Sequence, residues 1–129
     1  MTEQIVIAVV VRGDEFLLCH RVPTRRWYPD VWDLPGGHVE EGEEPAAALV
    51  RELHEELDIR VDEGMEPLVG VSFDNVDALV WVITNWAGEV RNAAPDEHDE
   101  IGWFRAGDLD GLEMADPQIV RLCELALNA

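Results

Sequence analysis

The segment Gly36–Ile59, GGHVEEGEEPAAALVRELHEELDI, is the stretch around which the rest of this chain is organised. It begins with a glycine turn and an acidic loop and continues into one amphipathic helix. Pro45 can open that helix, because the first helical turn needs no N–H from this position. One face of the helix is apolar at three- and four-residue steps and suited to burial: Ala46, Leu49, Val50, Leu53 and Leu57.

Three glutamates of the same helix, Glu52, Glu55 and Glu56, follow an i, i+3, i+4 spacing. Their carboxylates therefore gather on a second face, rotated by roughly a third of a turn from the apolar one. Like charges so close destabilise a helix by a few tenths of a kcal/mol per pair unless a cation lies among them. An acidic helix face is commonly plain solvated surface. Oxygen ligands, however, are what Mg²⁺ and Mn²⁺ prefer, so the cluster also suits a hard divalent cation.

The offsets between the glycine, the glutamates and an arginine are far more specific than the acidic face. They resemble the Nudix box, G-x5-E-x7-R-E-U-x-E-E-x-G-U with U apolar, over residues 37–59. The matching positions are Gly37, Glu43, Arg51, Glu52, Glu55, Glu56 and Ile59. Asp58 replaces the second glycine, which in the family is expected to end the helix in a left-handed conformation. The approach Trp32–Gly37, WDLPGG, is also similar to the family's usual entry into its box.

This resemblance implies an α/β (α+β) fold, the Nudix-type α/β/α sandwich with a mixed sheet between helices. It also implies a hydrolase that cleaves a nucleoside diphosphate linked to another group and uses Mg²⁺ or Mn²⁺. Arg51 would orient a neighbouring glutamate, and Glu43 would brace the loop before the helix. The metal ligands carried over from the family are Glu52, Glu55 and Glu56, with the carbonyl of Gly37 as a further donor.

The resemblance leaves the general base open, since family members use either a box glutamate or an acidic residue on a later loop. Here the acidic run 96–100, DEHDE, precedes the pair Trp103–Phe104, and members often have a glutamate shortly before such a pair. Glu97 is therefore expected to be a late metal ligand or the base, with Glu100 as the second choice. The alternative is an acidic surface loop. The four histidines form no zinc pattern, and none is assigned as a ligand.

Two residues outside the box are candidates for substrate binding. Arg21 lies at the end of a predicted strand, where similar Nudix enzymes often place a phosphate-contacting arginine; an ordinary salt bridge is the alternative. Asp116 lies at the predicted start of the last helix, where MutT-like members read the edge of the nucleobase, although helix capping also explains an aspartate there. Together with the aromatic Trp27 and Tyr28 of the arginine-rich loop, Asp116 suggests that the nucleobase lies across the sheet from the metal helix.

Apolar runs and turn residues outline a strand-rich chain with two helices. After the helix of the box, a closing helix is expected over 117–127, with Asp116 as its N-cap and Pro117 in its first turn. The predicted strands cover 5–11, 16–20, 68–73, 78–86 and 101–104, with turns over 12–15 and 74–77 and polar loops over 21–33 and 91–100. This order predicts a mixed sheet between helices.

Composition limits the partners. The 129 residues fit one domain, 1–129, and carry 28 acidic and 9 basic residues, a net charge of −19. Such a field repels nucleic acid polymers and anionic membranes but admits a small-molecule nucleotide screened by metal ions and arginines. No signal peptide or membrane span is visible, so a cytoplasmic monomer or homodimer is expected. Cys19 and Cys123 are expected to be core residues rather than a disulfide.

The box does not select a substrate. The best interpretation is a MutT-like (d)NTP pyrophosphatase that releases NMP and pyrophosphate, because the chain is close to the minimal length of the fold. Hydrolysis of nucleotide sugars or ADP-ribose is the alternative within the enzyme class. A Nudix module that senses a nucleotide without cleaving it is an alternative of another class, opposed by the presence of all the box carboxylates.

Overall fold

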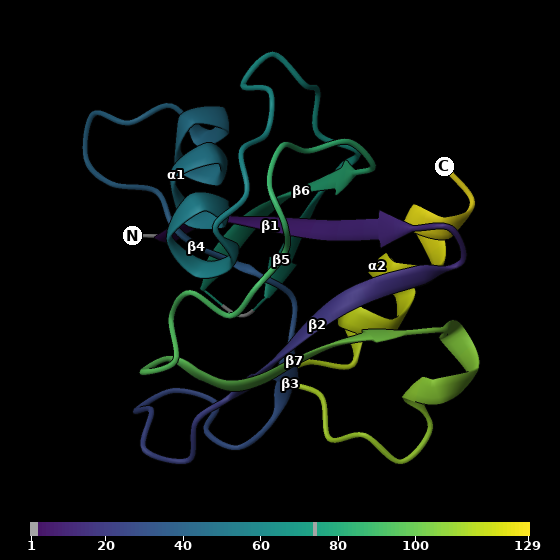
Figure 1. The fold of residues 1–129 in the computed structure, drawn as a ribbon. Helices are drawn as coiled ribbons and strands as arrows, with labels where there is room; N and C mark the ends of the chain where they lie inside the picture. The colour runs from purple at the N-terminus through teal and green to yellow at the C-terminus, as the bar shows by residue number, and fades with distance from the viewer. Residues whose placement is uncertain (1–2, 74) are drawn as a thin grey trace.

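The computed structural model describes residues 3–73 and 75–129 and arranges them as a twisted mixed sheet between two helices (Figure 1). In its described part the sheet has seven strands, with the order β3-β2-β1-β6-β5, while β4 pairs with β1 and β7 with β2. The strands are β1 Glu3–Arg12, β2 Glu15–Arg21, β3 Trp32–Asp33, β4 Gly36–His38, β5 Val69–Phe73, β6 Val76–Ile83 and β7 His98–Phe104. The helices are α1 Pro45–Leu57, the short 3-10 helix η1 Ala106–Leu109, and α2 Gln118–Leu127. The predicted α/β/α sandwich is confirmed.

Strand β1 is the centre of the sheet, as its β-branched sequence predicts. It runs parallel to β6 from Glu3 opposite Val76 to Val10 opposite Ile83, and antiparallel to β2 and β4. Its first half pairs with β4 and its second half with β2, so the sheet opens around β1. This opening brings the glycine turn of β4 against the second half of α1, where the candidate site lies.

Alternate side chains of β1 enter two different cores, one on each face of the sheet. On the face under α1, the buried residues include Val6, Ala8, Val10, Leu49, Leu53 and Leu57. On the face under α2, they include Ile7, Val9, Val11, Ile119, Leu122 and Cys123. Cys19 and Cys123 are both buried and unpaired with each other, which confirms their prediction as core residues.

Several predicted bounds differ from the structure by a few residues. Strand β6 begins at Val76, inside the predicted turn 74–77, because residues 76–83 pair with β1; Asp74 of that turn lies outside the described residues. The strand ends at Ile83 rather than at Trp86, where β1 no longer offers a partner. Strand β7 begins at His98 rather than at residue 101, because it pairs with β2 from Arg21 onward. The described residues contain no helix long and apolar enough to cross a membrane.

The two glycines of the turn before α1 are required for different reasons. Gly36 has φ of 152° and lies so close to β1 that a Cβ atom would collide with the carbonyl of Val6. At Gly37 a Cβ atom would collide with the carboxylate of Glu52 on α1. The turn therefore packs between β1 and the acidic face of the helix. A side chain at position 36 would push the turn away from β1, and one at position 37 would displace the Glu52 carboxylate.

The end of α1 shows how the chain tolerates aspartate at the glycine position of the box. Asp58 adopts the left-handed conformation, with φ of 57° and ψ of 34°, and its N–H bonds the carbonyl of His54 at 3.1 Å. Its carboxylate accepts a hydrogen bond of 2.9 Å from Arg91 Nε. The predicted left-handed helix end is confirmed, and Arg91 supplies a contact that glycine could not make.

Candidate active site

Glu56 is the most deeply buried carboxylate of α1, with an exposed fraction of 4%. Its Oε2 accepts a hydrogen bond of 3.1 Å from the N–H of Gly36, so the glycine turn holds it from one side. Its backbone carbonyl accepts a bond of 2.9 Å from the N–H of Ala93, which ties the loop after β6 to the same helical turn. The sequence predicts an acidic face beside the apolar one, and the structure places this part of it inside the molecule.

Glu52 lies one turn before Glu56 and is partly buried, and each carboxyl group affects the pKa of the other. Burial, followed by the charges of Glu52 and Glu97, raises the pKa of Glu56 well above its ordinary value. Burial also raises the pKa of Glu52, although Arg51 opposes this shift. A buried and a partly buried carboxylate that cannot both ionise easily form a pair that a cation would stabilise.

Arg51 connects the acidic residues of the box. Its Nε and Nη2 bind the two oxygens of Glu43 at 2.9 and 3.0 Å, and its Nη1 donates to Glu52 Oε1 at 2.9 Å. Its Nη2 also donates to the carbonyl of His38 at 3.1 Å. The fork on Glu43 lowers the pKa of that carboxyl to about 2 and raises the pKa of Arg51. Glu43 also accepts a bond of 3.0 Å from the N–H of Glu40, within the loop that precedes α1.

Glu55, the third glutamate of the predicted cluster, is more exposed than the other two and shares the Nη1 of Arg51 with Glu52. Its side chain is 57% exposed and lies 3.4 Å from Arg51 Nη1. In the described part of the chain, no three histidine, cysteine, aspartate or glutamate side chains converge closely enough to hold a metal ion. The predicted ligand atoms nevertheless suit a hard divalent cation, because all of them are oxygens. Two of the carboxylates, those of Glu52 and Glu56, repel each other and would be stabilised by a cation.

The acidic run 96–100 lies close to this pair. Glu97 is near enough that its charge raises the pKa of Glu56, and its carbonyl accepts a bond of 3.1 Å from the N–H of Val22. Its carboxylate is 45% exposed and lies 3.9 Å from Arg25 Nη2. Glu100 lies within β7, opposite His20 of β2. Of these two candidates for the late ligand or base, Glu97 is the one whose charge is among the main causes of the raised pKa of Glu56.

Arg21 ends β2, as predicted, but most of its donors are already engaged. Its Nη2 donates to the carbonyl of Trp27 at 2.7 Å and its Nε to that of Tyr28 at 2.9 Å. Its Nη1 lies 3.4 Å from Asp33 Oδ2. These bonds close the loop 22–31 and present Trp27 and Tyr28 to solvent, with exposed fractions of 66% and 53%. A phosphate contact by Arg21 would have to use Nη1, or replace loop carbonyls.

Asp116 lies just before α2, on the opposite face of the sheet from α1. The helix begins at Gln118, one residue later than predicted, and Pro117 is its cap. Pro117 itself has helical φ and ψ, so the difference is within the usual uncertainty of a helix end. Asp116 Oδ1 accepts a bond of 2.8 Å from the N–H of Gln118, so the aspartate does cap the first turn. The charge of Asp116 also contributes to the raised pKa of Asp33, so the two residues lie near each other.

His98 is the residue of this region that the sequence does not single out. It sits inside the run DEHDE, which looks like solvated surface, yet its exposed fraction is 2% because it begins β7 and turns inward. Its Nε2 lies 3.5 Å from Glu56 Oε1. Burial, followed by the charges of Arg25 and Arg21, lowers its pKa to about 4. Only the pairing of β7 with β2, a tertiary feature, reveals this position.

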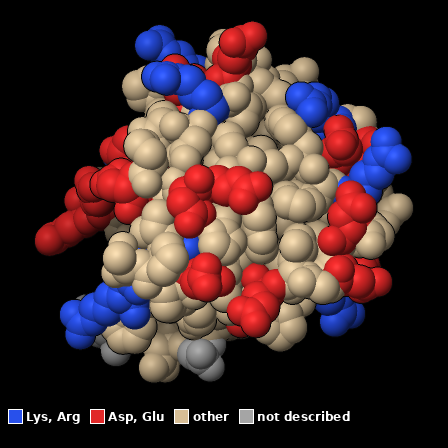
Figure 2. All heavy atoms as spheres, turned by 60° about the horizontal axis from the view of Figure 1, so that its bottom comes forward, with Lys and Arg blue, Asp and Glu red and all other residues tan. Residues whose placement is uncertain are grey.

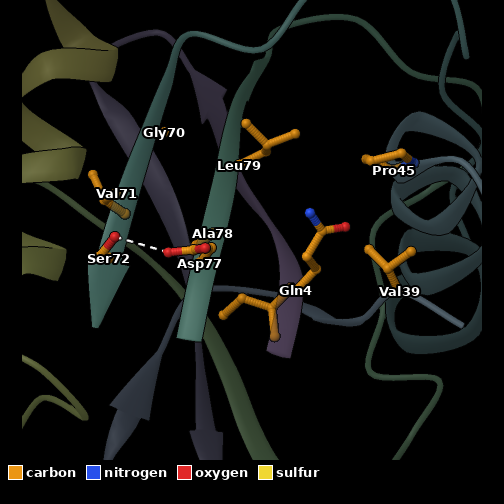
Figure 3. Close-up of a pocket in the computed structure, with 10 residues that line it drawn as sticks. Gln4, Val39, Pro45, Gly70, Val71, Ser72, Asp77, Ala78 and Leu79 are labelled. Carbon is orange, nitrogen blue, oxygen red and sulfur yellow. Dashed lines mark hydrogen bonds between the residues drawn. The ribbon is translucent and has the colours of Figure 1, made fainter. Parts of the chain in front are cut away.

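The surface carries acidic side chains across the face shown in Figure 2, with a group near its middle and most arginines toward the edge. A separate hollow of about 230 Å³ opens between β5, β6 and the start of α1 (Figure 3). In it Ser72 Oγ donates to Asp77 Oδ1 at 2.9 Å, and Gln4 projects toward Pro45. The hollow is lined by none of the predicted site residues, so it is distinct from the carboxylate pair.

Comparison with known proteins identifies the family to which this fold belongs. The NUDIX domain profile matches residues 1–123, and the chain belongs to the NUDIX family. The MutT NUDIX hydrolase from Burkholderia pseudomallei superposes with a TM-score of 0.78 at 28% identity, covering 99% of this chain and 97% of that one. The E. coli ORF135 protein superposes with a TM-score of 0.77 at 26% identity, covering 99% and 91%.

Two relatives show how varied the named activities are at this level of similarity. Human diphosphoinositol polyphosphate phosphohydrolase 3-alpha is 36% identical over an alignment of 107 positions that covers 75% of this chain. The Xenopus laevis m7GpppN-mRNA hydrolase NUDT17 is 39% identical over an alignment of 67 positions that covers 50% of this chain. The matches span 58% of the human relative and 23% of the Xenopus protein.

Proposed function

We propose that this protein is a metal-dependent hydrolase of nucleoside diphosphate derivatives, acting as a MutT-like (d)NTP pyrophosphatase that releases NMP and pyrophosphate. The observation that carries the proposal is the buried Glu56, held by the glycine turn, with the partly buried Glu52 one helical turn before it. Two carboxylates held together inside a protein are costly unless they bind a cation or perform acid–base chemistry. The solved neighbours titled MutT support the choice of substrate class.

The residues that would hold Mg²⁺ or Mn²⁺ are the box glutamates Glu52, Glu55 and Glu56, with the carbonyl of Gly37 and the carboxylate of Glu97 as further donors. When bound, a divalent ion would neutralise the charge that develops on the phosphate and make a water molecule more acidic. Arg51 supports this set because it holds Glu52 in place while its fork remains on Glu43. Its part in the reaction is to position a ligand.

The remaining roles belong to groups near Glu56. A carboxylate oxygen of Glu97, or of a box glutamate, takes the proton of the attacking water as general base. Arg21 binds a substrate phosphate through Nη1, the donor nitrogen with the longest contact to the protein, 3.4 Å to Asp33. The nucleobase of the substrate lies on the α2 side of the sheet, within reach of Asp116 and of the exposed aromatic rings in the loop 22–31.

A panel of substrates tests the reaction class directly. Nucleoside triphosphates, nucleotide sugars and ADP-ribose are each incubated with the protein and Mg²⁺ or Mn²⁺, and products are separated by ion-exchange chromatography. We expect NMP and pyrophosphate from triphosphates, with the highest kcat/KM in the panel, and no turnover in excess chelator. Inorganic phosphate as the product, or full activity with chelator, contradicts the proposal.

Hydrolysis of diphosphoinositol polyphosphates is a second candidate, because the human relative carries that name and is 36% identical. Nucleotide sugars and ADP-ribose remain alternatives within the same enzyme class. The net charge of −19 disfavours a ligand with many phosphates, since each added negative charge is repelled by the protein's field. The exposed rings of Trp27 and Tyr28 favour a ligand with a planar base, on which they could stack. Including a diphosphoinositol polyphosphate in the panel separates the two candidates.

A nucleotide-sensing module that binds without cleaving is the candidate from another class. It predicts saturable nucleotide binding, measured by quenching of tryptophan fluorescence, together with no product after long incubation. The complete set of box carboxylates favours the enzyme, because a sensor has no need of the buried Glu52 and Glu56 pair. The cytoplasmic location and the monomeric or dimeric state expected from the sequence stay predictions.

A further inference from the structure

We propose that His98 is a positioning residue, whose imidazole holds the carboxylate of Glu56 in the orientation that binds a divalent ion. The inference rests on the proposed function, because it takes Glu56 to be a ligand of that ion. It concerns a residue that lies outside the Nudix box and that no sequence motif selects.

The two oxygens of Glu56 are approached from two different segments. Oε2 accepts the N–H of Gly36 at 3.1 Å, and Oε1 lies 3.5 Å from Nε2 of His98. A carboxylate held at one oxygen alone can still rotate about its last torsion angle, so the second contact is the one that fixes its plane. The distance of 3.5 Å is longer than an ordinary N–H···O hydrogen bond, and a shift of about 0.5 Å would close it.

The loop before β7 is built to keep the His98 ring at this place. The carbonyl of His98 accepts a bond of 2.7 Å from Asn92 Nδ2, and its N–H bonds the carbonyl of Ala94 at 3.0 Å. The same loop is tied to α1 by the bond from Ala93 N–H to the carbonyl of Glu56 at 2.9 Å. The backbone of Glu56 therefore anchors the loop that carries His98, so the His98 ring and the Glu56 carboxylate cannot move independently.

The other ring nitrogen of His98 explains why packing alone does not account for the residue. A carboxylate that binds a cation is ionised and only accepts hydrogen bonds, so in that state Nε2 would carry the hydrogen and Nδ1 would be left as an acceptor. Among the described residues, Nδ1 is the one buried side-chain polar atom without a hydrogen-bond partner. A position with a purely structural role would be better filled by an apolar side chain, because a buried unpaired polar atom is unfavourable. The contact of Nε2 with the Glu56 carboxylate therefore explains the histidine better than packing does.

Two variants of similar size separate a donor from a space-filling side chain. His98→Gln carries an amide N–H that reaches toward Glu56 in place of Nε2, whereas His98→Met fills the pocket without a donor. Dissociation constants for Mn²⁺ are measured from the free-ion signal in electron paramagnetic resonance, and thermal unfolding in chelator records the stability of the fold. His54→Gln, an exposed histidine of α1, is the control for loss of an imidazole.

We expect His98→Met to weaken Mn²⁺ binding by about 10-fold or more, as loss of a residue that orients a metal ligand commonly does. His98→Gln should stay within about threefold of the unmutated protein, and His54→Gln should be unchanged. In turnover assays, raising the Mn²⁺ concentration should restore most of the kcat of His98→Met, because the defect lies in ion affinity. If His98→Met does not fold in chelator, His98→Leu takes its place in the same comparison.

Two negative results are distinguishable. If the unmutated protein binds no Mn²⁺, the proposed metal-dependent function fails and the role of His98 fails with it. If the unmutated protein binds Mn²⁺ and His98→Met binds it equally well, the role of His98 alone is wrong. A loss of thermal stability without a change in Mn²⁺ affinity also overturns the positioning role, since it is the result expected from packing.

Discussion

The two long helices cover opposite faces of one sheet, yet they bury different chemistry. Helix α2 is buried through Ile119, Leu122, Cys123 and Ala126, all of which are apolar or weakly polar. Helix α1 is buried through Ala48, Leu49, Leu53 and Leu57, but also through Glu56. One helix is thus optimised for packing alone, whereas the other includes a carboxylate that packing does not explain.

The difference shows that α1, unlike α2, includes carboxylates whose burial is unfavourable for the stability of the fold. Burial of Glu56 beside Glu52 raises both pKa values, which means that ionising the pair in the folded protein is unfavourable. No titratable side chain on α2 is buried apart from the thiol of Cys123, whose pKa burial raises to about 12, so the thiol stays neutral. The predictions below use matched changes on the two helices, ordered by the size of the expected effect.

Leu122→Ala should produce the largest loss of stability, about 2–5 kcal/mol, because it removes a buried side chain and leaves a cavity. Leu122 is 2% exposed in the core under α2. Urea unfolding measures the loss, and Leu125→Ala, at a position 46% exposed, should change stability by no more than about 0.5 kcal/mol. The kcat of the folded fraction should be unaffected by either change. A large fall in kcat for Leu122→Ala would mean that α2 is more than a packing element.

Glu56→Gln should show the opposite behaviour on α1. The amide is a poorer ligand for a hard cation, so kcat should fall by about 100-fold or more, equivalent to about 2.7 kcal/mol in the barrier. The amide oxygen can still accept the N–H of Gly36, so the fold should remain. Steady-state kinetics with Mg²⁺ and circular dichroism check the two statements. Glu124→Gln, an exposed position of α2, is the matched control, and a normal kcat for Glu56→Gln would remove Glu56 from the site.

Asp33 should make stability depend on pH below neutrality. Burial raises its pKa from 3.8 to about 6, so the folded protein holds this proton more tightly than the unfolded chain does. The stabilising contribution is complete below about pH 4 and is lost as the pH rises through about 6. A shift of about two units corresponds to about 3 kcal/mol, which solvent at the quarter-exposed side chain reduces to about 1–2 kcal/mol.

Urea unfolding of metal-free protein between pH 4 and 7 measures this dependence. Asp33→Asn keeps an acceptor for the N–H of Leu34, which now lies 2.8 Å from Asp33 Oδ1, and should flatten the slope between pH 4 and 6. Asp14→Asn, at an exposed position, should leave the slope unchanged. An unchanged slope in Asp33→Asn would assign the pH dependence to other groups.

Asp116→Asn should have the smallest effect on stability, a few tenths of a kcal/mol, because asparagine caps a helix about as well as aspartate. If Asp116 reads the base, the change should alter kcat/KM ratios among purine triphosphates, since an amide both donates and accepts hydrogen bonds. Measured kcat/KM values on several triphosphates decide the matter. Ratios equal to those of the unmutated protein would leave Asp116 with capping alone.

The sequence predicts the two ends of α1, because Pro45 suits a first helical turn and position 58 is expected to end the helix. It also predicts the sandwich and the central strand, since β-branched runs and helical periodicity are local signals. The start of β6 at Val76 was not predictable, because pairing with β1 overrides the turn residues before it. Likewise, the inward turn of His98 depends on the pairing of β7 with β2, and the acidic residues around it suggest the surface.

The candidate site shows the same division between local and tertiary information. Spacing places Glu52, Glu55 and Glu56 on one helix face, but it cannot show that Glu56 is buried while Glu55 is exposed. That difference arises because Gly36 and the loop before β7 cover only one end of the face. The roles assigned to these side chains, and to Arg21, Glu97 and Asp116, stay predictions until the variants are measured.

Thermal unfolding with and without metal tests most directly whether the buried carboxylates of α1 hold the ion. A ligand that binds only the folded protein raises Tm with its concentration. We predict that Tm of the unmutated protein rises with added Mn²⁺ and that Tm of Glu56→Gln does not. In chelator, Glu56→Gln should be at least as stable as the unmutated protein, since it no longer buries a charge beside Glu52. Equal Mn²⁺-dependent rises in both proteins, or no rise in the unmutated one, would contradict this account.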